Sequence, residues 1–114
     1  MNVGELASAL GLQVLAGQAL LQRQVSGGYA SDLLSCVMAK ARAGNIWVTL
    51  QAHANVVAVA SLLDLAAVII AEGIQPDTAT CEKAEAEGVV LLSASQTTYA
   101  VVGAATQLGI APGS

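Results

Sequence analysis

The sequence predicts an α/β domain in which helices pack on a mainly parallel sheet. Segments with a helical spacing of apolar residues alternate with short runs of β-branched residues along nearly the whole chain. The joints between them are short, and strand–helix–strand repeats of this kind favour parallel strands joined by crossover helices. Because 114 residues is the usual length of one domain, we expect residues 1–114 to form a single domain of two or three layers.

The first 25 residues predict a helix and two extended pieces. Asn2 and Glu5 have the spacing of a capping box, which starts a short helix that ends at Gly11. Residues 12–16 are typical of a short strand. Residues 21–25 predict a second extended piece, which leads into a polar stretch with two adjacent glycines.

The middle of the chain predicts two helices around a strand. Ser31 caps the first helix, which ends at Gly44. Its expected apolar face is Leu33, Leu34, Val37, Met38 and Ala41. Residues 46–50 predict a strand through their β-branched and aromatic content, and residues 55–63 predict a well-buried helix.

The last part of the chain predicts two strands, each followed by a helix. Residues 66–71 are continuously apolar, which is typical of an interior parallel strand. A helix is expected from Pro76 to Gly88, and a strand over residues 89–92. Residues 93–95 cap the final helix, which runs to Leu108 and ends at Gly109. We expect residues 111–114 to form a flexible tail.

The composition predicts self-association. Only 11% of the residues are charged, against about 25% in an average domain, so apolar surface is expected to remain exposed on a single chain. The net charge is −4, and Arg23, Lys40 and Arg42 are the scattered basic residues of the first half. An acidic chain of this kind lacks the electrostatic footprint of a nucleic-acid or anionic-membrane partner. We therefore expect a homodimer, with no nucleic acid and no membrane.

Further features point to the cytoplasm. Residues 54–71 approach the length of a membrane span, but Asp64 stands in their middle, which argues against one. Residues 1–5 do not resemble a signal peptide. Cys36 and Cys81 are far apart and unpaired in spacing, so we expect two free thiols in a reducing compartment.

Polar residues gather where the predicted strands end. Ligands of open α/β sheets bind beyond the carboxyl ends of the strands, where helix N-termini also point. The first candidate segment surrounds the paired glycines, with Arg23, Ser26, Gly27, Gly28, Tyr29, Ser31 and Asp32. The second and third follow two later strands and hold Thr49, Gln51, His53 and Asn55, then Ser93 and Ser95. Together they predict a site for a small anionic or nucleotide-like metabolite.

Each segment also has a purely structural interpretation. The paired glycines fit a tight turn followed by a serine cap. A lone histidine such as His53 more often caps a helix than performs chemistry. Ser95 is explained by helix capping. Three hydroxyl- and amide-rich turns at one edge are nevertheless more than capping requires.

No catalytic or metal-binding pattern is found. The glycine segment lacks the Lys-Ser/Thr ending of a phosphate loop and is not the GxGxxG pattern. One histidine and two distant cysteines do not make a zinc site, and no GxSxG motif is present. We expect no cofactor. For an enzyme, the best candidate residues are His53 and Cys36.

The stretch Leu21-Gln22-Arg23-Gln24-Val25-Ser26-Gly27-Gly28-Tyr29-Ala30-Ser31-Asp32-Leu33-Leu34-Ser35 resembles the DRTGG domain family. The resemblance continues through 37–39, 44–51, 53–60 and 65–70, and so covers most of the chain. Arg23, Gly27 and Gly28 match the namesake motif. Gln22 stands in place of its aspartate, and its threonine is replaced within residues 24–26.

The resemblance implies a fold like the N-terminal domain of HPr kinase/phosphorylase and an accessory, regulatory role. Such domains occur beside CBS pairs and commonly associate as dimers. Kinase activity is not implied, because the phosphate loop of the kinase lies in a different domain.

Three hypotheses follow from the sequence. The first is a non-catalytic, homo-oligomeric regulatory module whose partner is a second copy or another protein. The second is a sensor of a small phosphorylated metabolite at the glycine-rich segment and the helix N-termini. The third is a small enzyme of unknown reaction.

Overall fold

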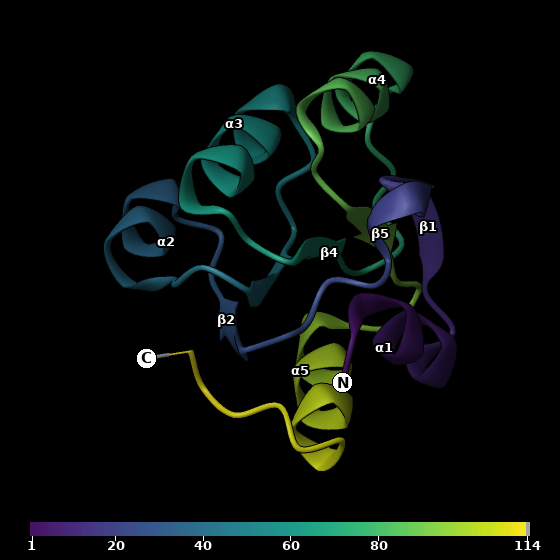
Figure 1. The fold of residues 1–114 in the computed structure, drawn as a ribbon, viewed down its shortest axis with the longest axis vertical. Coiled ribbons are helices and arrows are strands. Elements are labelled where there is room, and N and C mark those ends of the chain that lie inside the picture. The colour runs from purple at the N-terminus through teal and green to yellow at the C-terminus, as the bar shows by residue number, and fades with distance from the viewer. Residues whose placement is uncertain (114) are drawn as a thin grey trace.

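A five-stranded sheet lies between two layers of helices. The computed structural model describes residues 1–113. The helices α2, α3 and α4 cover one face of the sheet and α1 and α5 cover the other, giving three layers (Figure 1). The strands are β1 (Gln13–Ala16), β2 (Gly27–Ala30), β3 (Asn45–Thr49), β4 (Ala67–Ile70) and β5 (Leu91–Ser93). The helices are α1 (Val3–Leu10), α2 (Leu34–Lys40), α3 (Ala54–Leu63), α4 (Thr78–Glu87) and α5 (Thr98–Gln107), with a short 3-10 helix η1 (Gln18–Leu20).

The sheet is mainly parallel, as the sequence predicts. Its strand order is β1-β5-β4-β3-β2, and β2 to β5 are parallel to one another. Only β1 is antiparallel, and its pairing with β5 shifts register between Val14 and Ala16. The α/β fold class is confirmed.

Side chains alternate between two apolar cores, because successive residues of a strand point to opposite faces. In β3, Ile46 and Val48 face α1 and α5, whereas Trp47 faces α2, α3 and α4. The central strand β4 is buried along its whole length, which explains its uninterrupted apolar sequence.

The helix boundaries follow their capping residues. In α1, Asn2 and Glu5 form the expected capping box, and Gly11 ends the helix in the left-handed region with φ 66°. The helix α4 begins after Asp77 and ends at Gly88, as predicted. The C-cap of α3 is Asp64, a residue other than glycine at φ 56°.

The second extended piece lies later in the chain than the sequence predicts. Residues 21–25 form no strand, because their backbone hydrogen-bonds to the start of the chain: Gly4 N–H donates to Leu21 O and Val25 N–H donates to Met1 O. The strand β2 begins instead at Gly27, so the paired glycines lie within a strand and not in a turn.

Two helices also begin or end elsewhere than predicted. The helix α2 begins after Leu33 and ends at Lys40, well before Gly44, and both Leu33 and Met38 are exposed. A seven-residue helix that is covered on one side only cannot bury every apolar residue. The helix α5 is capped by Thr97, whose side chain accepts a hydrogen bond from Ala100 N–H, and not by residues 93–95.

The end of the chain crosses the edge strand β2. The sequence predicts a flexible tail here, but residues 111–113, which we call the strap, are hydrogen-bonded to β2. Gly28 N–H donates to Ala111 O (2.9 Å) and Gly113 N–H donates to Gly28 O (2.8 Å). A Cβ at Gly27 would lie 3.0 Å from Gly113 Cα, so this close crossing explains the glycine in β2. Ser114 lies outside the described residues.

Candidate functional site

The carboxyl edge of the sheet gathers eight of the predicted site residues. They lie at or just beyond the ends of β2, β3 and β5, or at the start of α3: Ser31, Asp32, Thr49, Gln51, His53, Asn55, Ser93 and Ser95. The other five lie elsewhere. Arg23, Ser26 and Gly27 are at the amino end of β2, and Gly28 and Tyr29 are inside it. Because β2 begins at Gly27, the glycine segment is divided between the two edges of the sheet.

The side chain of Asp32 organises the carboxyl edge. One of its oxygens, Oδ1, accepts hydrogen bonds from Leu50 N–H (2.7 Å) and from the Thr49 hydroxyl (3.0 Å). The amide of Gln51 donates to the backbone oxygen of Asp32 (3.1 Å). These contacts tie the end of β2 to the end of β3. They occupy N–H and O–H groups that an anionic ligand would otherwise use.

A second carboxylate, that of Glu72, occupies the N-terminus of α5. Its Oε2 accepts a hydrogen bond from Thr98 N–H (2.8 Å), and its own N–H donates to Gln96 O. Glu72 has φ 65°, a left-handed conformation that is uncommon outside glycine. The helix dipole at this end is therefore already matched by a negative charge of the chain itself.

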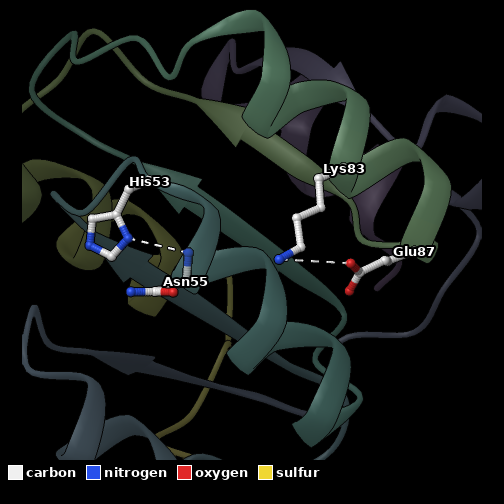
Figure 2. A network of polar contacts seen from close by, with 4 residues as sticks. All are labelled: His53, Asn55, Lys83 and Glu87. Atoms are coloured by element: carbon white, nitrogen blue, oxygen red, sulfur yellow. Dashed lines mark hydrogen bonds and ion pairs between the residues drawn. The ribbon is translucent and has the colours of Figure 1, made fainter.

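His53 acts as a helix cap. It is exposed, and its Nδ1 accepts a hydrogen bond from Asn55 N–H (3.2 Å) at the start of α3. Figure 2 shows the imidazole ring beside this backbone group, with the exposed Lys83–Glu87 ion pair (3.9 Å) on the neighbouring helix α4. The lone histidine thus has a structural role in this arrangement.

The serines of the third segment are spread apart. Ser93 is buried in β5, and its hydroxyl donates to Gln13 Oε1 at 3.5 Å, the limit of a hydrogen bond. Ser95 is exposed in the loop before α5.

At the opposite edge of the sheet, the Ser26 hydroxyl donates to Ala43 O and accepts from the buried side-chain amide of Asn45. This hydroxyl therefore supports the turn before β3.

Cys36 and Cys81 are both free and half-buried. Burial raises the pKa of the Cys81 thiol, and the nearby carboxylates of Asp77 and Glu82 raise it further. A thiol with a raised pKa remains protonated and is a poor nucleophile near neutral pH. Within residues 1–113, no group of three or more His, Cys, Asp or Glu side chains could hold a metal ion.

Asp77 gives a testable pH dependence. The Thr80 backbone N–H and then the Thr80 side chain hydrogen-bond to this carboxylate and hold its pKa below the ordinary value of 3.8. A lowered pKa in the folded state means that the stabilisation is present above the unfolded pKa and is lost as the pH falls through the folded pKa.

Asp77→Asn retains a capping oxygen but not the charge, so we expect the variant to be less stable than the native chain at about pH 6, and the difference to shrink as the pH falls below about 4. Urea denaturation at a series of pH values would measure the difference. A gap that stays constant down to the lowest pH would contradict the assignment to Asp77.

An apolar cavity lies away from the side chains gathered at the carboxyl edge. It has a volume of about 280 Å³ and lies between α5, the strap and the surface of β2 and β3. Its walls include Ile46, Val48, Val102, Ala105 and Ile110. Gly28 and Tyr29 of the predicted site also line it, but no sequence pattern points to the other residues as a site. For Val102, Ala105 and Ile110, the only signal is the absence of any charged residue from 88 to 114.

The solvent face of α5 next to this cavity is also uncharged. Tyr99 is 92% exposed and Val102 is 36% exposed, and Gly103 and Thr106 are exposed on the same helix. Residues at positions i, i+3, i+4 and i+7 lie on one side of a helix. These four residues therefore form one stripe, which we call the α5 stripe.

Comparisons with known proteins give a match of fold and not of sequence. No family model matches the chain, and no curated protein matches it in sequence. A similar solved structure holds the CBS and DRTGG domains of the regulatory region of Clostridium perfringens pyrophosphatase, complexed with the activator diadenosine tetraphosphate. The TM-score is 0.71 at 11% identity, over 93% of this chain and 46% of that chain. The chain thus shares its α/β fold with part of a regulatory region and spans about half of its length.

No helix within residues 1–113 is long and apolar enough to cross a membrane.

Proposed function

We propose that this chain is a non-catalytic regulatory module of the DRTGG type that works in the cytoplasm by self-association. The observation that carries the proposal is the uncharged surface of α5, where Tyr99 at one end is 92% exposed and an apolar cavity lies toward the other end. Exposed apolar surface of this kind marks protein contacts in soluble proteins. The fold shared with a pyrophosphatase regulatory region supports a regulatory role, and the DRTGG-like residues 21–35 agree with it.

The arrangement at the carboxyl edge supports a role without catalysis. His53 caps α3, the pKa of Cys81 is raised, and Asp32 bonds to the backbone of β3. An acid–base mechanism needs an oriented pair of groups within hydrogen-bond reach of a substrate position. His53 and Asp32 are engaged in holding the fold instead, and the Cys81 thiol stays protonated near neutral pH.

A second candidate function is the sensing of a nucleotide-like metabolite. The observation that favours it is the structural neighbour, which was solved with diadenosine tetraphosphate. Against it, Asp32 and Glu72 place negative charge where a phosphate would bind, so we rank self-association first. Isothermal titration calorimetry with ATP and with diadenosine tetraphosphate separates the two: micromolar binding to the isolated chain would favour the sensor.

Val102→Glu tests self-association. We expect the native chain to sediment as a dimer and the variant as a monomer, with the dissociation constant raised at least about 100-fold, because a carboxylate buried in an apolar contact has no partner. Sedimentation equilibrium over a range of concentrations measures the constant.

The matched control is Leu62→Glu, which places the same charge on α3, in the opposite layer of helices, at a side chain that is 70% exposed. It should leave the dimer unchanged. A native chain that stays monomeric at every concentration would overturn the proposed function.

A further inference from the structure

The α5 stripe and the apolar cavity are arranged so that a side chain from the stripe of one copy can enter the cavity of another. The cavity lies toward the C-terminal end of α5, where Ala105, Thr106 and Ile110 line it. The exposed side chain of Tyr99 lies at the N-terminal end of the same helix. The molecule therefore carries a large apolar knob and an apolar hollow on one surface.

A two-fold axis brings the knob of one copy to the hollow of the other. If two α5 helices pack antiparallel with the axis between residues 102 and 103, position 99 of one copy lies opposite position 106 of the other. Closed dimers use the same patch on both subunits in this way, so that residue i contacts residue j and j contacts i. The knob and the hollow would thus meet twice, once on each side of the axis.

The residue at the crossing point allows the two helices to approach closely. A Cβ built at Gly103 meets no atom within 4 Å, so the space above the helix is open there. Val102 and Thr106 beside it are short and uncharged. No like-charge contact arises when the stripe meets its own copy, since residues 88–114 carry no charge.

The direction expected of a side chain at position 99 agrees with this arrangement. Helical side chains lean toward the N-terminus of their own helix. In an antiparallel pair that direction is the C-terminal direction of the partner, so Tyr99 leans over Thr106 and toward Ile110 of the second copy. An apolar cavity of roughly 150 Å³ holds benzene, so about 280 Å³ is ample for a phenol ring.

The area that the tyrosines contribute is a substantial part of what a dimer needs. An aromatic side chain buries about 150–250 Å² on full burial, so two tyrosines supply roughly 300–500 Å² of the approximately 1,600 Å² of a standard interface. The rest of the stripe and the rim of the cavity would have to supply the remainder.

We propose that Tyr99 of one copy inserts into the apolar cavity of a second copy, in an antiparallel α5–α5 interface that is closed by a two-fold axis. The inference rests on the proposed self-association and adds which surface, which orientation and which residue carry it. The occupant of the cavity is thus a side chain of this same protein.

Two variants on opposite sides of the contact test the insertion. Tyr99→Ala removes the knob, and Ala105→Leu fills the hollow without touching Tyr99 of its own chain. Each is expected to raise the dimer dissociation constant at least about 100-fold, because every dimer contains the contact twice and buried tyrosines are common hot spots. In the double variant, the two effects on the free energy of dimer dissociation should be far less than additive. Once Tyr99 is removed, filling the cavity excludes no tyrosine.

A cross-link shows the orientation directly. p-Benzoylphenylalanine in place of Tyr99, irradiated in the full chain, is expected to join two copies, with peptide mapping placing the bond within residues 102–112 of the second copy. The same group in place of Leu62 serves as the control and should give no such product. Urea denaturation of each variant shows whether it is folded.

The outcomes separate this inference from the proposed function. A native chain that is monomeric overturns both. A native dimer whose dissociation constant is unchanged by Tyr99→Ala and by Ala105→Leu, with cross-links that map elsewhere, overturns the insertion alone. A native mass spectrum in which Ala105→Leu loses a bound small molecule but keeps the dimer also overturns it, since the cavity would then be a ligand site.

Discussion

Replacing Gly17 by alanine is expected to lower the free energy of unfolding by more than about 3 kcal/mol. Gly17 joins β1 to η1 at φ 81°, a left-handed conformation that costs other residues roughly 1–2 kcal/mol. The added Cβ would also lie 2.7 Å from Val90 Cα and 2.9 Å from Val90 Cγ2. Because Val90 is fully buried just before β5, its backbone cannot move aside cheaply.

Gly11→Ala is the matched control for the Gly17 prediction. Gly11 also has a left-handed conformation, at φ 66°, but nothing lies within 4 Å of an added Cβ. Only the conformational cost remains, so we expect a loss of about 1 kcal/mol. Urea denaturation followed by the fluorescence of Trp47 measures both variants. Equal losses at the two positions would show that the approach to Val90 is not what requires glycine.

Trp47→Ala is expected to cost about 3–5 kcal/mol, a large part of the stability of a domain of this size. The side chain is completely buried between the sheet and the layer of α2, α3 and α4. Its indole N–H donates to Ser31 O (2.8 Å), just beyond the end of β2. The substitution therefore removes apolar contacts and leaves a carbonyl without its donor.

Trp47→Phe separates the two contributions. Phenylalanine keeps most of the apolar contact but cannot donate to Ser31 O, so we expect a loss of about 1–3 kcal/mol. Trp47 is the only tryptophan, so far-UV circular dichroism must follow the unfolding of both variants. A phenylalanine variant as unstable as the alanine variant would show that the hydrogen bond outweighs packing at this position.

Local patterns predict the interior of the fold well. The run 66–71 contains β4, because a buried parallel strand needs continuous apolar sequence. Most of the predicted strand 46–50 lies in β3, as its β-branched and aromatic residues indicate. The start of α1 follows from Asn2 and Glu5, whose contacts are only three residues apart. These features depend on neighbours in the sequence, so the sequence alone reveals them.

The errors concern contacts between distant parts of the chain. Gly27 and Gly28 resemble a turn, but they lie in β2, and Gly27 is required where the strap passes close to it, more than 80 residues later in the chain. The sequence predicts too early a start for α5, because Ser95 and Thr97 are both good caps and only Thr97 is used. The next residue, Thr98, donates its N–H to the distant Glu72 side chain. No local pattern contains that information.

The predicted ligand site shows the same limit. That the ends of parallel strands meet at one edge follows from the fold, and Asp32, Thr49 and Gln51 are accordingly in contact. What the pattern does not reveal is that these polar groups bond to one another. The apolar cavity beside α5 is harder still to predict, because residues from β2, β3, α5 and the strap form it together.

Both outer strands of the sheet are unsuited to extension by another chain. An exposed edge strand is a template for further strands and hence for fibrous aggregation. On one side, the register shift between Val14 and Ala16 distorts β1. On the other, the strap uses both backbone hydrogen-bonding groups of Gly28. With open-ended growth hindered at both edges, an assembly of limited size would have to form through helical surfaces, as in the α5 contact proposed above.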